Sequence, residues 1–143
     1  MNRKEIVLVA MAPANRCQHS PVQMQKLLFL IDQAIPEEVN GPIFDFQPYN
    51  YGPFDKAVYE TLEELANEGL VTVIPVHTWR EYLLTEAGQR EGDRLLQRIS
   101  QKARDYIQAA SQFVRELSFT QLVSAIYKAY PEMRANSVFQ EQP

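Results

Sequence analysis

The chain has 143 residues, 45% of them hydrophobic, which suits one domain with an ordinary core and is too short for two. Its single cysteine, Cys17, excludes an internal disulfide, and no apolar run approaches the roughly 20 residues of a membrane helix, so we expect a cytoplasmic protein that does not enter the membrane. A net charge of −4 disfavours a nucleic-acid partner without excluding it, since contacts to phosphate supply most of the affinity of such complexes.

Two helices are predicted in the first 36 residues. Residues 3–11 are expected to form the first one. The start of the second is marked by a capping box at Ser20 and Gln23 and by Pro21, since proline suits the first helical position. Apolar side chains then occupy almost every side of this helix, which predicts a central, buried element that ends at Pro36. The apolar residues at helical spacing are Met24, Leu27, Leu28, Ile31 and Ala34.

A short strand and a third helix are predicted next. Polar and apolar residues alternate over residues 43–49, and a proline near the end of this run favours an edge strand. Gly52 provides a permissive cap, Pro53 suits the first helical turn, and Asp55 suits the positive end of a helix. We therefore expect the third helix to span residues 53–68. Its core stripe is expected to be Phe54, Val58, Leu62, Leu65 and Ala66.

The rest of the chain predicts a hairpin and two more helices. Two β-prone runs, residues 70–74 and 82–84, are separated by a tip of moderate length. Thr85 is expected to cap a fourth helix that runs to about Tyr106. A second capping box, over residues 118–121, predicts the last helix.

This order of elements resembles a winged helix. Residues 82–88, Tyr-Leu-Leu-Thr-Glu-Ala-Gly, look like the closing strand and helix cap common in winged-helix proteins. The resemblance implies an α+β fold: a mainly helical winged-helix domain with a small antiparallel wing hairpin, an inserted edge strand and C-terminal helices. We expect a single domain, with the winged-helix unit at about residues 3–88, a helical extension at about 89–133 and a tail over 134–143.

A second resemblance involves two short motifs. Residues 25–30 read Gln-Lys-Leu-Leu-Phe-Leu, and residues 46–54 read Phe-Gln-Pro-Tyr-Asn-Tyr-Gly-Pro-Phe. Together they are similar to the Panacea-type antitoxin domain and, more closely, to the YwgA-like family of small bacterial proteins, whose C-terminal region residues 126–132 also resemble. The match covers about residues 21–133. It implies a winged-helix-like fold and, for the Panacea relatives, neutralisation of a toxin by direct protein contact.

Aromatic and acidic side chains supply the candidate surface for a protein partner. Rigid rings beside a fixed backbone at residues 49–54 are good anchors, although the same segment could serve only as a structural turn. The third helix carries five acidic side chains against one lysine, which suits a basic partner such as a toxin better than DNA, unless this face is simply solvated. The tryptophan in the hairpin tip is either an anchor or a core residue. The candidate partner-binding residues are Tyr49, Tyr51, Phe54, Glu60, Glu64 and Trp79.

The alternative hypothesis is a DNA-binding transcription regulator, dimeric through its C-terminal helices. Cations at four-residue intervals would form one ridge along the fourth helix, and one more arginine lies beside the wing. This ridge could contact nucleic acid or an acidic protein, or it could be solvated and locally paired. The candidate nucleic-acid-binding residues are Arg80, Arg90, Arg94, Arg98 and Lys102.

Catalysis has little support in the sequence. His19 and His77 are the only histidines and fall in separate elements, so no metal site is predicted. Cys17 near His19 would allow a nucleophile and its base, but no orienting or oxyanion motif accompanies them. We therefore expect a non-catalytic protein-interaction module of the antitoxin-like kind, without cofactor or metal.

Overall fold

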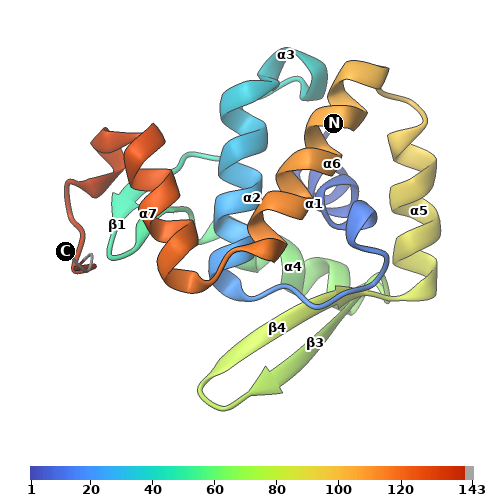
Figure 1. Ribbon diagram of the computed structural model, residues 1–143. Coiled ribbons are helices and arrows are strands. Elements are labelled where there is room, and N and C mark those ends of the chain that lie inside the picture. The colour runs from blue at the N-terminus through green and yellow to red at the C-terminus, as the bar shows by residue number, and fades with distance from the viewer. Residues whose placement is uncertain (141–143) are drawn as a thin grey trace.

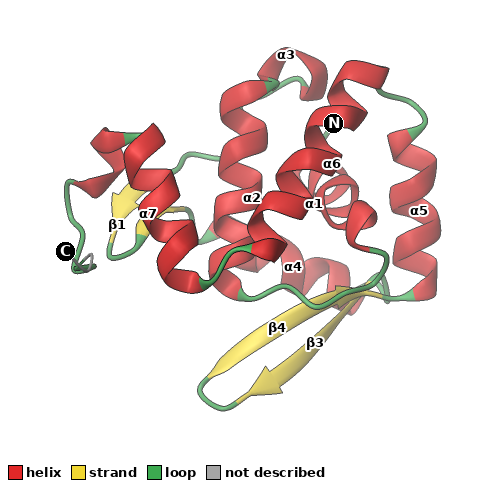
Figure 2. Ribbon diagram, viewed as in Figure 1, coloured by secondary structure: helices red, strands yellow, loops and turns green. Residues whose placement is uncertain are grey.

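The fold is α+β, with helices in the majority and two small antiparallel hairpins (Figures 1 and 2). The computed structural model describes residues 1–140. Its helices are α1 (Arg3–Met11), α2 (Pro21–Ala34), α3 (Pro36–Val39), α4 (Ala57–Asn67), α5 (Glu86–Leu96), α6 (Gln101–Glu116) and α7 (Phe119–Ala129), with 3-10 turns η1 (Ala12–Ala14) and η2 (Pro131–Arg134). The strands are β1 (Gln47–Tyr49), β2 (Gly52–Phe54), β3 (Val71–Val76) and β4 (Trp79–Leu84).

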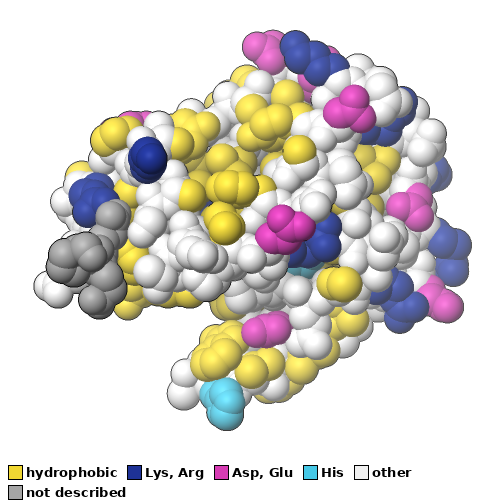
Figure 3. Space-filling model, in the orientation of Figure 1, with side chains coloured by type: hydrophobic (Ala, Val, Ile, Leu, Met, Phe, Trp, Pro, Cys, Tyr) yellow, Lys and Arg dark blue, Asp and Glu magenta, His cyan; other side chains and the backbone are white. Residues whose placement is uncertain are grey.

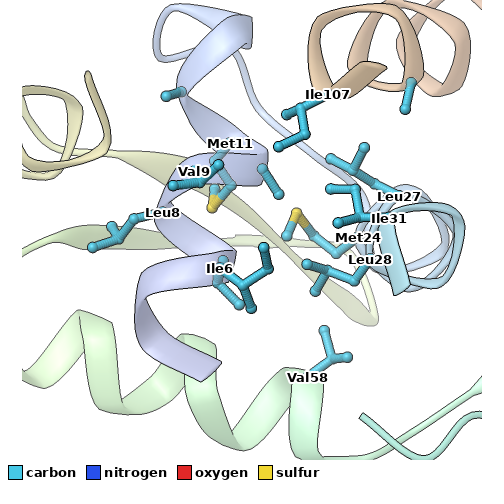
Figure 4. Packing of buried hydrophobic residues seen from close by; sticks show 14 of the residues in the cluster. Ile6, Leu8, Val9, Met11, Met24, Leu27, Leu28, Ile31, Val58 and Ile107 are labelled. Carbon is cyan, nitrogen blue, oxygen red and sulfur yellow. The ribbon is translucent and has the colours of Figure 1, made fainter. Parts of the chain in front are cut away.

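The hydrophobic core is built around α1 and α2. Every residue of α1 from Ile6 to Met11 is buried, so this helix, and not only α2, is central. Figure 4 shows Ile6 of α1 on the side of Met24 and Leu28 of α2, while Leu8 points to the opposite side of α1. Val58 of α4 and Ile107 of α6 lie on two further sides of the cluster. Burial on all sides explains why neither helix shows a clear polar face in the sequence.

The bounds of three helices were predicted closely, two of them from capping boxes. The capping box at Ser20 and Gln23 has both of its hydrogen bonds, at 3.1 and 2.8 Å, and Pro21 opens α2 as predicted. The box at Ser118 and Gln121 likewise opens α7. The bounds predicted for α1 are confirmed as well, and its start carries a further capping box, at Asn2 and Glu5, that was not predicted.

The third helix begins later than predicted. Gly52 and Pro53 do not open it, because residues 52–54 form β2, which pairs with β1 in the register Tyr49↔Gly52 and Gln47↔Phe54. Gly52 has a φ of +106°, which is incompatible with a helix and suits a turn. The helix starts only at Ala57, whose N–H donates to the Asp55 carboxylate at 2.9 Å.

The predicted edge strand is also shorter than expected. Only residues 47–49 pair as a strand, because the backbone N–H groups of Ile43 and Phe44 donate to the buried Asp32 carboxylate instead, at 3.2 and 2.9 Å. The alternation over residues 43–49 therefore reflects a loop with Phe44 turned into the core, not a continuous strand.

The fourth helix is divided in two, contrary to prediction. The helix α5 ends at Leu96, and Ser100 caps a new helix, α6. The Arg104 guanidinium stabilises the turn between them by donating to the carbonyl oxygens of Leu96 and Ile99 at 3.2 and 2.9 Å. Carbonyl groups freed at a helix end need such partners, so Arg104 is part of the break.

The hairpin of β3 and β4 projects from the helical body (Figure 1). Its strands are longer than predicted and its tip is only His77 and Thr78. At its base, His19 ahead of α2 forms an isolated bridge with Tyr82 of β4. The next helix, α5, packs closely against Leu70 because Gly88 has no side chain. A Cβ at this position would lie 1.9 Å from the Leu70 carbonyl oxygen.

The C-terminal segment lies against the other hairpin. Val138 donates its N–H to the Asn50 carbonyl oxygen at 3.0 Å, and the Tyr127 hydroxyl donates to Ser137 at 2.6 Å. The last part of the predicted tail, residues 141–143, lies outside the described residues. No helix within residues 1–140 is long and apolar enough to cross a membrane.

Candidate functional site

A pocket of about 190 Å³ lies where the β1–β2 hairpin meets α2 and α4. We call it the aromatic pocket, because four aromatic residues and two polar residues of α2 line most of it: Tyr49, Tyr51, Phe54, Tyr59, Gln25 and Lys26. It brings together the two sequence motifs, at residues 25–30 and 46–54, that are 16 residues or more apart in the chain.

The Gln25 side chain holds the hairpin against α2. Its amide donates to the Asp55 carbonyl oxygen at 3.0 Å and accepts the Asp55 N–H, also at 3.0 Å. These two hydrogen bonds are the ones that the backbone of a neighbouring strand would make with Asp55, and they fix the chain just before α4. Because Gln25 is buried and both of its amide atoms are used, its role is structural.

Lys26 lies at the floor of the aromatic pocket and is the least expected of its residues. Only 3% of its surface is exposed, and its ammonium group donates to the Pro53 carbonyl oxygen at 3.3 Å. That is the one hydrogen bond it makes within residues 1–140. Burial lowers the pKa of Lys26 to about 8, and no described carboxylate raises it again. A buried cation without a counterion is unusual in a folded domain.

Gly52 lies beside the Lys26 side chain in the pocket lining. A Cβ at this position would lie 3.5 Å from both Cε and Nζ of Lys26, in ordinary van der Waals contact. The positive φ of Gly52 is a further reason for glycine at this position, since other residues rarely adopt it.

The walls of the aromatic pocket are a chain of rings that contact one another in tilted and edge-to-face arrangements. The ring centres of Tyr49 and Phe54 are 5.0 Å apart, and those of Phe54 and Tyr59 are 5.7 Å apart. At the rim, Tyr49 and Tyr51 are 52% and 42% exposed. Tyr51 also packs edge-to-face on exposed Phe119 of α7, which extends the apolar rim beyond the hairpin. Tyr49, Tyr51 and Phe119 are thus three of the large apolar side chains that the described residues leave exposed.

The other predicted partner-binding residues lie elsewhere. Glu60 and Glu64 line a separate open groove with the first residues of α1. The charge of α4 is partly compensated, since Glu63 pairs with Arg80 and Glu68 pairs with Lys4 at 3.0 Å. Trp79 is exposed in the projecting hairpin, where its indole N–H donates to Glu81 at 3.1 Å.

The predicted basic ridge is not continuous. Arg90 and Arg94 belong to α5, Arg98 lies in the turn after it, and Lys102 is in the first turn of α6. The prediction of a continuous ridge is wrong, because a four-residue spacing places these side chains on one face only where the helix is unbroken. Arg94 pairs with Glu91, and the groove beside it holds further acidic groups. Figure 3 shows basic and acidic side chains interspersed on the face that it draws.

Cys17 and His19 do not form a nucleophile and base. His19 is fully buried and makes no hydrogen bond to the Cys17 side chain, which is exposed. Burial, helped by the nearby Arg115 cation, lowers the pKa of His19 to about 4. Among residues 1–140, no three His, Cys, Asp or Glu side chains are grouped so that they could hold a metal ion.

Sequence reasoning identified the aromatic half of the pocket but not its polar floor. Gln25 and Lys26 stand in a run that is otherwise apolar and buried, from Met24 to Phe29. Two polar residues within such a run were the available signal, since polar side chains in a buried helix need a specific partner. Comparisons with models of protein families, with curated proteins and with solved structures found no match to this chain.

Proposed function

We propose that this chain is a non-catalytic protein-interaction module of the antitoxin-like kind, which binds a partner protein at the aromatic pocket and thereby regulates or neutralises it. The observation that carries the proposal is the pair of exposed tyrosines, Tyr49 and Tyr51, at the rim of a preformed pocket. Tyrosine is among the residues that contribute most to binding energy at protein interfaces.

The size of the pocket favours a protein ligand. At about 190 Å³ it is smaller than the roughly 300–1,000 Å³ typical of sites for small molecules and cofactors. It has room for one inserted side chain, with Phe119 beside Tyr51 offering further contact area outside. A recessed anchor surrounded by an exposed apolar rim is the usual plan of a hot spot between proteins.

The same proposal includes a winged-helix core made of α1, α2, α4 and the β3–β4 hairpin. Two observations support it: α4 leads directly into β3, and His19 between α1 and α2 bridges to Tyr82 of β4. In this proposal the hairpin is the wing and the β1–β2 hairpin is the insertion that creates the pocket.

The candidate partners are the proteins encoded by the genes next to the gene of this chain, and measuring their binding would test the proposal. Each candidate partner is coexpressed with the chain and the affinity of any complex is measured by calorimetry. We expect Tyr51→Ala to weaken binding about 30-fold or more, as for a hot-spot residue of about 2 kcal/mol. Phe113→Ala, which truncates an exposed ring of α6, is the matched control and should leave the affinity unchanged.

Two results would contradict the proposal. One is a stable complex with a partner that tolerates Tyr49→Ala and Tyr51→Ala but is lost in Glu64→Arg or Trp79→Ala, which would move the interface to another face. The other is salt-sensitive binding to duplex DNA that is lost in Arg94→Glu, which would favour the transcription regulator.

A further inference from the structure

We propose that the aromatic pocket recognises an acidic side chain of the partner protein, whose carboxylate pairs with the ammonium group of Lys26. This inference rests on the proposed function and specifies its chemistry. It begins from the floor of the pocket, where a 97%-buried cation has one carbonyl partner and no described carboxylate beside it.

The groups around Lys26 leave an anion as the complementary ligand. Tyr59 of α4 faces the same pocket, and burial raises the pKa of its phenol, so it is neutral. A Cβ at Gly52 would also lie 3.5 Å from the ring of Tyr127 of α7, and the Arg134 guanidinium is 4.7 Å from the centre of that ring. The carboxylate of Asp55 accepts the N–H groups of Asp45 and Ala57.

A cationic ligand is disfavoured despite the aromatic walls. Clusters of tyrosine and phenylalanine often bind ammonium groups through their faces, but here Lys26 already places a positive charge inside the cluster. A second cation would be repelled at close range in a site with little water. The charge at the floor thus decides the sign of the ligand.

Folding has already removed Lys26 from water, so a carboxylate meets an amine that needs no further desolvation. Pairing must offset only the desolvation of the incoming carboxylate, which is the advantage of a preorganised site. The methylene groups of a glutamate would lie against the paired rings of Tyr49 and Phe54, which suits a side chain that is apolar along its stem and charged at its end.

We commit to a side chain because of the available volume. A chain terminus would bring its last side chain and its backbone into the same space of about 190 Å³, whereas a glutamate side chain enters alone. The probes are therefore N-acetyl-glutamic acid amide, its neutral analogue N-acetyl-glutamine amide, and N-acetyl-glutamine with a free terminal carboxylate.

The experiment follows the Lys26 side chain of the wild-type protein by NMR, with ¹³C-labelled lysine, while each probe is added. We expect the glutamic acid amide to bind about tenfold or more tightly than its glutamine analogue, as for a hydrogen bond between charged groups. It should also raise the pKa of Lys26 above its value of about 8. Its affinity should fall as the pH rises from 7 to 10, while that of the glutamine amide stays constant.

Two variants complete the test. Lys26→Met keeps the length of the side chain and should remove the preference for glutamate, whereas Lys56→Met, at an exposed lysine, should keep it. Equal affinity for the two amides, or tighter binding of the free terminal carboxylate, would overturn the proposal.

The outcomes also separate this inference from the proposed function. A partner complex that is lost in Tyr51→Ala, combined with no preference for glutamate, would refute only the carboxylate. A clear glutamate preference, combined with a partner complex that tolerates Tyr49→Ala and Tyr51→Ala, would refute the proposed protein interface but support the carboxylate site at Lys26.

Discussion

Replacing Lys26 by methionine should change the pH dependence of stability in a defined way. The pKa of Lys26 falls from 10.5 to about 8 on folding. At 1.36 kcal/mol for each pKa unit, the buried charge costs the folded state about 3 kcal/mol at neutral pH. Because the folded pKa is the lower one, this cost is fully present below pH 8 and is relieved as the pH rises toward 10.5.

The wild type should therefore gain stability relative to Lys26→Met between pH 7 and pH 9. Above pH 8 Lys26 is mostly deprotonated in the folded state and still protonated in the unfolded state. Raising the pH from 7 to 9 therefore increases the free energy of unfolding of the wild type by about 1.3 kcal/mol relative to Lys26→Met. Urea unfolding of both proteins at the two pH values measures this difference, and tyrosines with raised pKa values act on both proteins alike. A difference that does not change with pH would refute the reasoning, and Lys56→Met should show no such change.

Three further predictions concern stability and are checked by chemical unfolding. Between pH 7 and 5 the wild type should lose about 2 kcal/mol relative to His19→Leu, because the unfolded histidine binds a proton near pH 6.5 and the folded one only near pH 4. Asp32→Asn should be as stable as the wild type or more so: burial raises the pKa of Asp32, which shows that its charge is disfavoured, and an amide oxygen can still accept the N–H groups of Ile43 and Phe44. Asp32→Ala removes that acceptor and should lower the free energy of unfolding by about 1–3 kcal/mol. Gly88→Ala should cost about 3 kcal/mol through its clash with a carbonyl oxygen, and Gly69→Ala, which meets no atom within 4 Å, only about 1–2 kcal/mol for its positive φ.

Local chemistry made part of the fold predictable. The capping boxes at Ser20 and Ser118 depend on residues three positions apart, so the sequence contains all that is needed to place α2 and α7. The late start of α4 depends instead on Gln25, which pairs with Asp55 from 30 residues away. Proline in the first turn of a helix and proline in a short strand look alike in sequence, and that distant amide decides between them.

The division of the fourth helix had a similar cause. Ser100 is a good N-cap, but the charged residues around it keep a helical spacing, so the pattern alone favours one long helix. What distinguishes the two cases is Arg104, whose guanidinium binds the carbonyl groups released at the break. The candidate site shows the same limit, because the rings of Tyr49 and Tyr51 were predictable anchors while the position of Lys26 beneath them required the fold.

The energetic cost of Lys26 connects the stability of the fold to the proposed interaction. A domain of ordinary stability has about 5–15 kcal/mol in total, so about 3 kcal/mol for one unpaired charge is a large share. Methionine fits the same length of chain without that cost, and natural proteins commonly keep such destabilised positions where activity depends on them. A carboxylate from a partner would recover part of this energy on binding, since the ion pair replaces an isolated charge. If Lys26→Met proves more stable than the wild type and also loses glutamate binding, the same buried charge both destabilises the free protein and determines the specificity of the complex.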